Sequence, residues 1–523
     1  MEALRTDVAI IGGGLGACAA ALAAARLGCR VILTEETHWV GGQLTNQAVP
    51  PDEHPWIEEF GATATYRALR EGIRTYYRAH LPLTAAARAD AKLNPGNGWV
   101  SRLCHDPRVA VAVLHQMMIP YQLGGRLFVM HPHRPVSVWT NGDRITGVLV
   151  RSAESGRESL IEAQYFIDAT PYGDLLDLAE VEHVLGAESR AETGEPHAAE
   201  VADPRDQQAI TVCFAMENRP GEDHTIERPL QYELWRDLRP PGWPGPLLAW
   251  TTPRPETHEP LTRLLFEVNG KDRSLWDFRR ILDRSNFDDG LASEDITVVN
   301  WPQNDYWFGP VVGVDTQEQA RNVEAARQLS LSLLYWMQTE APRPDGGVGY
   351  PGLRLRGDVV GGTPDGLAQA PYVRESRRLR SELIVVEQHI AHAVRPDGPE
   401  LFHDSVGIGC YRIDLHPRVS GAGYLDIACW PFQIPLGAMI PVRVENLLPG
   451  GKNLGVTHIT NGAFRLHPVE WNVGEVAGLL SAFCLQRKLV PRSVRNKAEL
   501  LGEFQSLLRR EGIELSWPRL EPV

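Results

Sequence analysis

The chain has 523 residues, of which 43% are hydrophobic and 23% charged, a composition typical of globular proteins. At this length we expect roughly two to four domains rather than one small core. Its 66 acidic residues outnumber its 52 basic ones and give a formal net charge of −14, which argues against nucleic-acid binding because that function needs a basic surface.

The N-terminal stretch carries no recognisable leader and no membrane span. A basic region followed by an apolar core is missing, and the most apolar run, residues 8–27, contains four glycines and Arg26. The seven cysteines include no CxxC spacing, so we expect neither a disulfide framework nor a metal site. These features predict a cytoplasmic protein that contacts no membrane; the oligomeric state stays open.

The first 35 residues predict a βαβ unit. Residues 7–11 form a continuous apolar run that suits a buried parallel strand. An alanine-rich helix follows and ends at Gly28, and a second apolar run leads to Glu35. This order of elements is the one that a nucleotide-binding unit requires.

The loop of this unit carries a dinucleotide-binding fingerprint. Gly12, Gly14 and Ala17 occupy the key positions of GxGxxG/A, where they allow a tight turn, close approach to a pyrophosphate and helix packing. Glu35 ends the second strand, where an acid accepts hydrogen bonds from a ribose. The competing interpretation is a glycine-rich turn of another α/β protein, which the register of strand, helix and acid disfavours.

Further elements follow along the chain. We expect helices over 57–79 and 106–123, the second ended or kinked by Pro120. The Asn141-Gly142 pair predicts a β-hairpin, and a last strand over 164–167 precedes the segment Ala169-Thr170.

The C-terminal half predicts three helices, over 372–393, 468–487 and 496–511. Strand signals return at 432–434 and 445–448.

Several separated motifs resemble one flavoprotein family. Residues 41–45 (GGQLT) resemble the second glycine pair of flavoproteins of the glutathione-reductase structural class. Residues 136–170, 372–378, 404–416 and 465–478 resemble further segments of FAD-dependent oxidoreductases near the fumarate-reductase and tricarballylate-dehydrogenase flavoproteins. The resemblance covers most of the chain and implies FAD and an oxidoreductase activity, without fixing the substrate.

The fingerprint and the resemblance together imply a set of FAD-binding residues. Pro171, Lys452 and Trp471 depart from the family pattern, so the surroundings of the flavin should be unusual. The predicted FAD-binding residues are Gly12, Gly13, Gly14, Leu15, Gly16, Ala17, Glu35, Glu36, Gly41, Gly42, Gln43, Leu44, Thr45, Val136, Ala169, Thr170, Gly451, Lys452, Asn453, Asn472 and Val473.

The expected fold class is α/β, with a discontinuous Rossmann-type FAD-binding domain, a β-meander and an inserted α+β substrate domain. The ranges are 1–50, 102–185 and 402–490 for the FAD-binding domain, 51–101 for a helical insertion, 186–401 for the substrate domain and 491–523 for a helical tail.

Three arginines are expected on one helix. Arg374 and Arg377, with Arg378, could clamp a carboxylate substrate through bidentate hydrogen bonds. A structural salt-bridge helix is the equally supported alternative.

The catalytic face is expected beside residues 458–465. Arg465 should anchor the substrate or balance the charge of the flavin, and His458 or His416 should accept a proton. Asp414 should converge with them at the domain junction. The helix that begins near Pro468 is expected to point its N-terminus at the flavin N1–C2=O edge.

The favoured function is oxidation of a small organic substrate by hydride transfer to flavin N5, with reoxidation by O₂ or an external acceptor. Two alternatives remain: a flavin monooxygenase or reductase supplied with electrons by a partner, and a non-redox protein that binds FAD.

Overall fold

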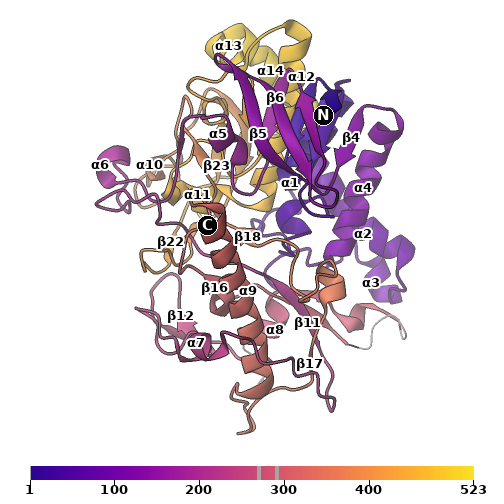
Figure 1. Ribbon diagram of the computed structural model, residues 1–523, viewed down its shortest axis with the longest axis vertical. Coiled ribbons are helices and arrows are strands. Elements are labelled where there is room, and N and C mark those ends of the chain that lie inside the picture. Colours follow the sequence, from indigo (N-terminus) through magenta and orange to yellow (C-terminus); the bar gives the residue numbers. More distant parts are fainter. Residues whose placement is uncertain (1, 268–272, 289–293) are drawn as a thin grey trace.

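The computed structural model describes residues 2–267, 273–288 and 294–523. Its centre is a five-stranded, all-parallel sheet in the order β24-β8-β2-β3-β4, which makes this a Rossmann-type α/β fold and confirms the predicted βαβ unit (Figure 1). The bounds are β2 (Val8–Ile11), β3 (Val31–Thr34), β4 (Leu127–Met130), β8 (Tyr165–Asp168) and β24 (Leu447–Pro449).

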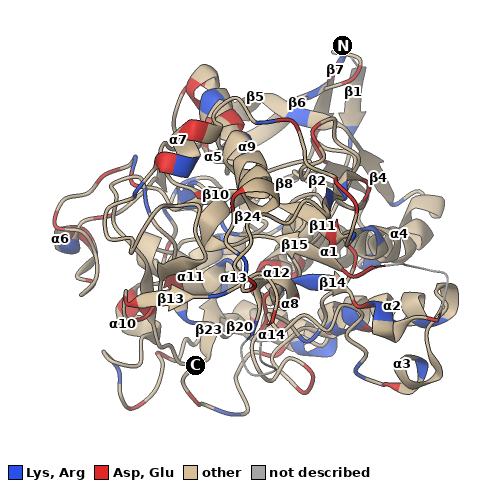
Figure 2. Ribbon diagram, turned by 90° about the horizontal axis from the view of Figure 1, so that it is seen from below, with Lys and Arg blue, Asp and Glu red and all other residues tan. Residues whose placement is uncertain are grey.

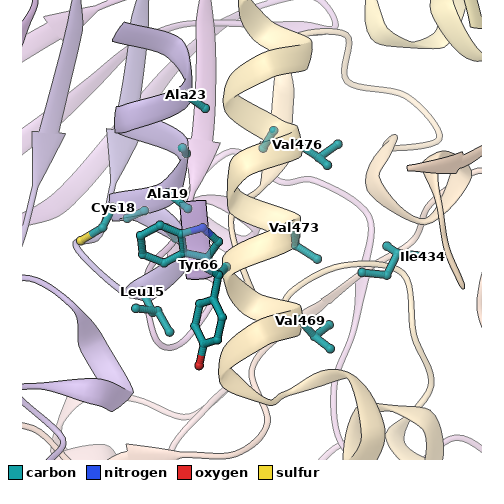
Figure 3. Packing of buried hydrophobic residues seen from close by; sticks show 14 of the residues in the cluster. Leu15, Cys18, Ala19, Ala23, Tyr66, Ile434, Val469, Val473 and Val476 are labelled. Atoms are coloured by element: carbon teal, nitrogen blue, oxygen red, sulfur yellow. The ribbon is translucent and has the colours of Figure 1, made fainter. Parts of the chain in front are cut away.

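Two buried helices, α1 (Leu15–Arg26) and α12 (His467–Arg487), pack against each other beside this sheet. Small residues allow the close approach: a Cβ added to Gly474 would lie 1.9 Å from the carbonyl oxygen of Gly16. Figure 3 shows the two helices side by side, with Val473 pointing away from α1 toward Ile434. The contacts run from residue 16 against 474 to residue 20 against 478, so both helices begin at the same end.

The meander is a four-stranded sheet in the order β1-β7-β6-β5. Its strands are β1 (Glu2–Arg5), β5 (His133–Asn141), β6 (Arg144–Ser152) and β7 (Glu158–Glu162). The predicted hairpin turn is confirmed, and Gly142 supplies the positive φ of +58° that this tight turn needs.

The helices of the first third are α2 (Ala64–His80), α3 (Ala85–Ala89) and α4 (Pro107–Leu123). The expectation that Pro120 would end or kink the helix over 106–123 was wrong, because α4 continues to Leu123. Pro120 lies in the last turn, where the helix ends anyway at Gly124, so a lost backbone hydrogen bond costs little.

A second hydrophobic core lies between residues 209 and 373, around the long helix α9 (Thr316–Thr339) in the lower half of Figure 1. Two antiparallel sheets surround it, in the orders β14-β15-β11-β17 and β16-β10-β18. This separate core supports the predicted inserted domain, whose boundaries remain a prediction. Figure 2 shows acidic and basic residues together on the outer helices α2 and α7.

The remaining elements are short or close the C-terminal part. They are η1 (Gly42–Leu44), α5 (Asp174–Leu178), β9 (His183–Val184), α6 (Arg190–Thr193), β10 (Ile210–Thr211), β11 (Phe214–Asn218), α7 (Tyr232–Asp237), β12 (Thr251–Pro253), β13 (Pro260–Thr262), α8 (Leu275–Phe278), β14 (Arg280–Leu282), β15 (Ile296–Val299), β16 (Asp305–Tyr306), β17 (Leu353–Leu355), β18 (Tyr372–Val373), β19 (Arg378–Leu379), α10 (Glu387–Ile390), β20 (Ser405–Gly409), β21 (Ile413–Leu415), β22 (Leu425–Ile427), β23 (Phe432–Pro435), α11 (His458–Phe464), α13 (Pro491–Asn496) and α14 (Ala498–Arg510).

The helix expected over 372–393 was wrong. This segment forms β18, β19 and the single turn α10 instead. Arg374 and Arg378 are drawn to different buried carboxylates, Asp305 and Glu188, and one helix could not serve both. The helices expected over 468–487 and 496–511 are confirmed as α12 and α14. Within the described ranges, no helix is long and apolar enough to cross a membrane.

Candidate functional site

A narrow cleft lies where the loops after β2, β8 and β24 meet the start of α1. Parallel strands end at the same edge of a sheet, so their loops converge there. Asn46, Gln47 and Glu470 also line the cleft and were missed from the sequence. The predicted FAD-binding residues in its wall are Gly14, Glu35, Gly42, Gln43, Ala169, Thr170, Gly451 and Lys452.

Gly12 makes the turn between β2 and α1 possible. Its φ of +94° lies in the left-handed region, and an added Cβ would stand 2.4 Å from the carbonyl carbon of Ala169. Only glycine allows the chain to leave β2 this sharply and begin α1 with free N–H groups at the cleft.

Glu35 is a buried carboxylate held by the chain itself. The Gly13 N–H donates to Oε2 (3.0 Å), while the backbone and hydroxyl of Thr37 donate to Oε1 (2.8 and 2.7 Å). Burial raises the pKa of Glu35 despite these hydrogen bonds, which favour its charged form. The next residue, Glu36, is exposed.

The cleft fits a polar, phosphate-bearing cofactor. Three side-chain oxygens in its wall, Gln43 Oε1, Asn46 Oδ1 and Gln47 Oε1, are buried without a hydrogen-bond partner among the described residues. Lys452 adds a cation, and its removal from water lowers its pKa to about 8. Such acceptors suit hydroxyl and amino groups, while the cation and the start of α1 suit phosphates.

The first turn of α12 places a carboxylate at the start of α1. Glu470 Oε1 accepts from the Gly16 N–H (3.4 Å), and Oε2 accepts from the Gln43 side-chain amide. The expectation that this helix N-terminus points at the flavin remains a prediction, but Glu470 is the group that it presents to the cleft.

Other predicted FAD-binding residues lie outside the lining of the cleft. Asn472 donates to the carbonyl of Val406 (3.5 Å), Val473 packs in the core, and Val136 lies in the meander strand β5. Asn453 donates to the carbonyl of Asp168 (3.0 Å). The remaining ones, in or next to the turn and α1 or around η1, are Gly12, Gly13, Leu15, Gly16, Ala17, Gly41, Leu44 and Thr45.

A second hollow, called here the central cavity, has a volume of about 360 Å³. Four predicted residues from three separate segments meet in its wall: Arg374, Asp414, His416 and Arg465. β21 ends next to His416, and α11 ends at Arg465, so the fold rather than the sequence order brings them together.

These side chains form one chain of hydrogen bonds and ion pairs. Arg465 Nη2 donates to Asp414 Oδ2 (2.8 Å), which lies 3.6 Å from His416 Nε2. His416 Nδ1 lies 2.6 Å from Asp305 Oδ2, and Asp305 Oδ1 accepts from Arg374 Nη2 (2.9 Å). His416 therefore lies between two aspartates, with Nδ1 facing the fully buried one.

Both aspartates are held in the charged form. Burial works against the charge of Asp414, but His416 and Arg465 lower its pKa well below the ordinary value. Arg374 and His416 lower the pKa of Asp305 in the same way. A charged Asp305 accepts the Nδ1–H of His416 and leaves Nε2 as the ring nitrogen that faces Asp414 and the cavity.

Two other predicted residues lie elsewhere. His458 Nδ1 is 2.8 Å from Glu375 and its Nε2 is 3.2 Å from Arg418, outside the wall of the central cavity. Arg377 pairs with Asp177 of α5 (3.1 Å). The structure thus separates Arg374, which reaches the cavity, from Arg377, which does not.

The cleft and the central cavity are neighbours. Lys452 of the cleft donates to the carbonyl of Val373 (2.6 Å) and lies over the ring of Tyr372, 5.0 Å from its centroid. Tyr372 lines the cavity and accepts from Arg465 Nη1 (2.7 Å). Gln43 of the cleft also donates to the Arg465 carbonyl (3.3 Å), so both walls are joined.

The sequence model of FAD dependent oxidoreductases matches residues 7–508. The chain belongs to this family. It is an FAD-dependent oxidoreductase enzyme, as the resemblance implied, and its cofactor is FAD. No curated protein matches the chain.

Solved structures give only distant similarity. The myxobacterial chondrochloren halogenase CndH is 14% identical, with 97% of this chain and 80% of that one covered and a TM-score of 0.31. A geranylgeranyl bacteriochlorophyll reductase-like protein from Thermoplasma acidophilum is 9% identical, with 98% and 85% covered and a TM-score of 0.33. L-proline dehydrogenase from P. horikoshii is 16% identical, with 35% and 24% covered and a TM-score of 0.18. The matches to the first three solved structures span 24%, 46% and 35% of those chains.

Proposed function

We propose that this enzyme oxidises a small organic substrate in the central cavity by hydride transfer to flavin N5, with reoxidation by O₂ or an external acceptor. The observation that carries the proposal is the cavity itself: it holds an aspartate-bound histidine and adjoins the cleft of the predicted FAD-binding residues. FAD, when bound, supplies a two-electron acceptor.

For the cofactor, we propose that the start of α1 around Gly14 and Gly16, together with Lys452, holds the phosphates. Glu35 is proposed to face the ribose, and Gln43 and Asn46 to use their unpartnered oxygens as acceptors. Each role follows from the charge or the hydrogen-bonding group that the residue offers.

For the chemistry, we propose His416 as the proton acceptor. When the substrate carbon loses its hydrogen with the bonding electron pair, the attached hydroxyl or amino group must lose a proton, and Nε2 is available to take it. Asp305 fixes the ring through Nδ1, and Asp414 stabilises the imidazolium that forms. Arg465 and Arg374 are proposed to hold the substrate, because their guanidinium groups line the cavity.

Anaerobic screening of a metabolite library for flavin bleaching tests the proposal, followed by two histidine variants. With an active compound, His416→Gln should reduce the rate of flavin reduction by about 100-fold or more and leave the FAD content unchanged. His458→Gln, which alters a buried ion pair outside the cavity, should lower stability and leave that rate within a few-fold.

Normal reduction in His416→Gln with loss of reduction in His458→Gln would reverse the assignment. Rapid reduction by NAD(P)H without substrate would favour the partner-supplied monooxygenase or reductase. Absence of bleaching by every compound would favour a non-redox role.

A further inference from the structure

The wall of the central cavity contains buried donors that the chain does not pair. The Nε atoms of Arg279, Arg374 and Arg465 have no hydrogen-bond partner among residues 2–267, 273–288 and 294–523, although these side chains belong to residues only 8%, 2% and 2% exposed. Asn300 Nδ2 and Trp301 Nε1 are unpartnered in the same wall. All five are donors that cannot accept, so an acceptor-rich ligand would satisfy them.

The charges of the wall point the same way. Six arginines and three aspartates line the cavity, with no other charged side chain among them. Asp305, which pairs with Arg374 from behind the wall, reduces the excess to two positive charges. A cation would be repelled by this surplus, and a neutral molecule would leave it uncompensated.

Part of the surplus lies around one tryptophan. The guanidinium groups of Arg263 and Arg273 lie over the ring of Trp99, 5.4 and 4.9 Å from its centroid. In the described part of the chain, neither arginine has a carboxylate within 4.0 Å. Partial burial and the neighbouring Arg254 and Arg273 lower the pKa of Arg263, which shows that its charge lacks compensation.

These two donor sets differ in depth. Arg279, Arg374 and Arg465 are buried, whereas Arg263 is half-buried and Arg273 is exposed. A cavity of about 360 Å³ holds roughly a dozen heavy atoms, so a small molecule could reach both sets.

We infer that the central cavity binds a small dianion, one end held by the buried arginines Arg279, Arg374 and Arg465 and the other by Arg263 and Arg273 on Trp99. Both ends are oxyacid groups, carboxylate or phosphate, because a guanidinium group pairs with either through two parallel hydrogen bonds. That this dianion is the compound oxidised rests on the proposed function.

Isothermal titration calorimetry of the FAD-loaded protein tests the charge rule with probes of one chain length. Glutarate should bind at least tenfold more tightly than valerate, and 1,5-pentanediol and cadaverine should not bind. Added salt should weaken glutarate binding more than valerate binding. Equal binding of glutarate and valerate, or binding of the diol or the diamine as tight as that of glutarate, would overturn the inference. 3-Phosphonopropionate distinguishes the sources: tighter binding than glutarate indicates that one end takes a phosphate-type group.

Variants test the two-ended arrangement. Arg263→Gln should weaken glutarate about tenfold and leave valerate unchanged, because only the second charged end is lost. Arg228, which also lies over an aromatic ring (5.4 Å from the Tyr232 centroid) but outside the cavity, gives the matched control, and Arg228→Gln should change neither affinity. Unchanged glutarate binding in Arg263→Gln would refute the outer end.

The outcomes separate the two proposals. Glutarate binding that depends on Arg263, combined with no flavin reduction by any anion, would remove the proposed oxidation and leave the dianion site. Flavin reduction by a neutral or cationic compound would keep the oxidation and remove the dianion site.

Discussion

His467, the first residue of α12, should make the protein sensitive to acid. Its Nδ1 accepts the Asp52 N–H (3.0 Å), so the proton of the neutral ring is on Nε2 and is donated to the Val49 carbonyl (3.2 Å). The residue is fully buried, and burial lowers its pKa from the ordinary 6.5 to about 3. In the unfolded chain the ring is protonated below pH 6.5, whereas in the folded protein it stays neutral down to about pH 3. Stability from this group is therefore full above pH 6.5 and falls as the pH drops.

The size of the effect follows from the two pKa values. Between pH 7 and pH 5 the loss is about 2 kcal/mol, since each pH unit below 6.5 costs about 1.4 kcal/mol. Replacing His467 by Gln keeps an acceptor and a donor but removes the titration. Denaturant unfolding followed by tryptophan fluorescence at both pH values should show that His467→Gln loses about 2 kcal/mol less than the parent protein. The exposed His38 gives the control, and His38→Gln should behave like the parent. An equal loss in His467→Gln and the parent would refute the reasoning.

Three further outcomes test the cleft, the helix pair and the histidine. Gly14→Val should place methyl groups in the cleft near Glu470 Oε1, 3.1 Å from an added Cβ, and FAD absorbance per protein should disappear; full FAD content would contradict the fingerprint. Gly474→Ala should force α1 and α12 apart and cost about 1–3 kcal/mol in unfolding, whereas Gly502→Ala, with open space around its Cβ, should cost nothing; equal stability of the two would contradict the packing. Asp305→Asn should slow substrate-dependent flavin reduction at unchanged FAD content, because it loosens both His416 and Arg374; a normal rate would remove Asp305 from the positioning of the ring.

Local signals explain what could be predicted of the fold. The apolar run before Gly12, the alanine-rich helix and the acid at position 35 are contiguous, and their spacing alone dictates a βαβ unit. The same holds for the Asn141-Gly142 turn and for α12, whose sequence is apolar on all sides because the helix is buried on all sides.

Tertiary ion pairs explain what could not be predicted. The segment from Tyr372 has the composition of a helix, but Arg374 and Arg378 are satisfied by partners far away in the sequence. Asp305 carried no local signal beyond its place in a proline- and tryptophan-rich stretch, and its role depends on β16 lying opposite His416. A cavity assembled from separate segments can be recognised only after the fold is known.

The start of α12 ties the cofactor cleft to the central cavity within six residues. Arg465 holds Asp414 in the cavity, and Glu470 lies in the cleft at the start of α1. Gln43 bonds to both, through the carbonyl of Arg465 and the carboxylate of Glu470. Glu470 accepts the Gly16 N–H at a helix start that attracts anions, so a phosphate placed there would compete with the carboxylate for the same donor. Any shift of Glu470 would pass through Gln43 to the backbone of Arg465, so binding at one hollow is expected to affect the geometry of the other.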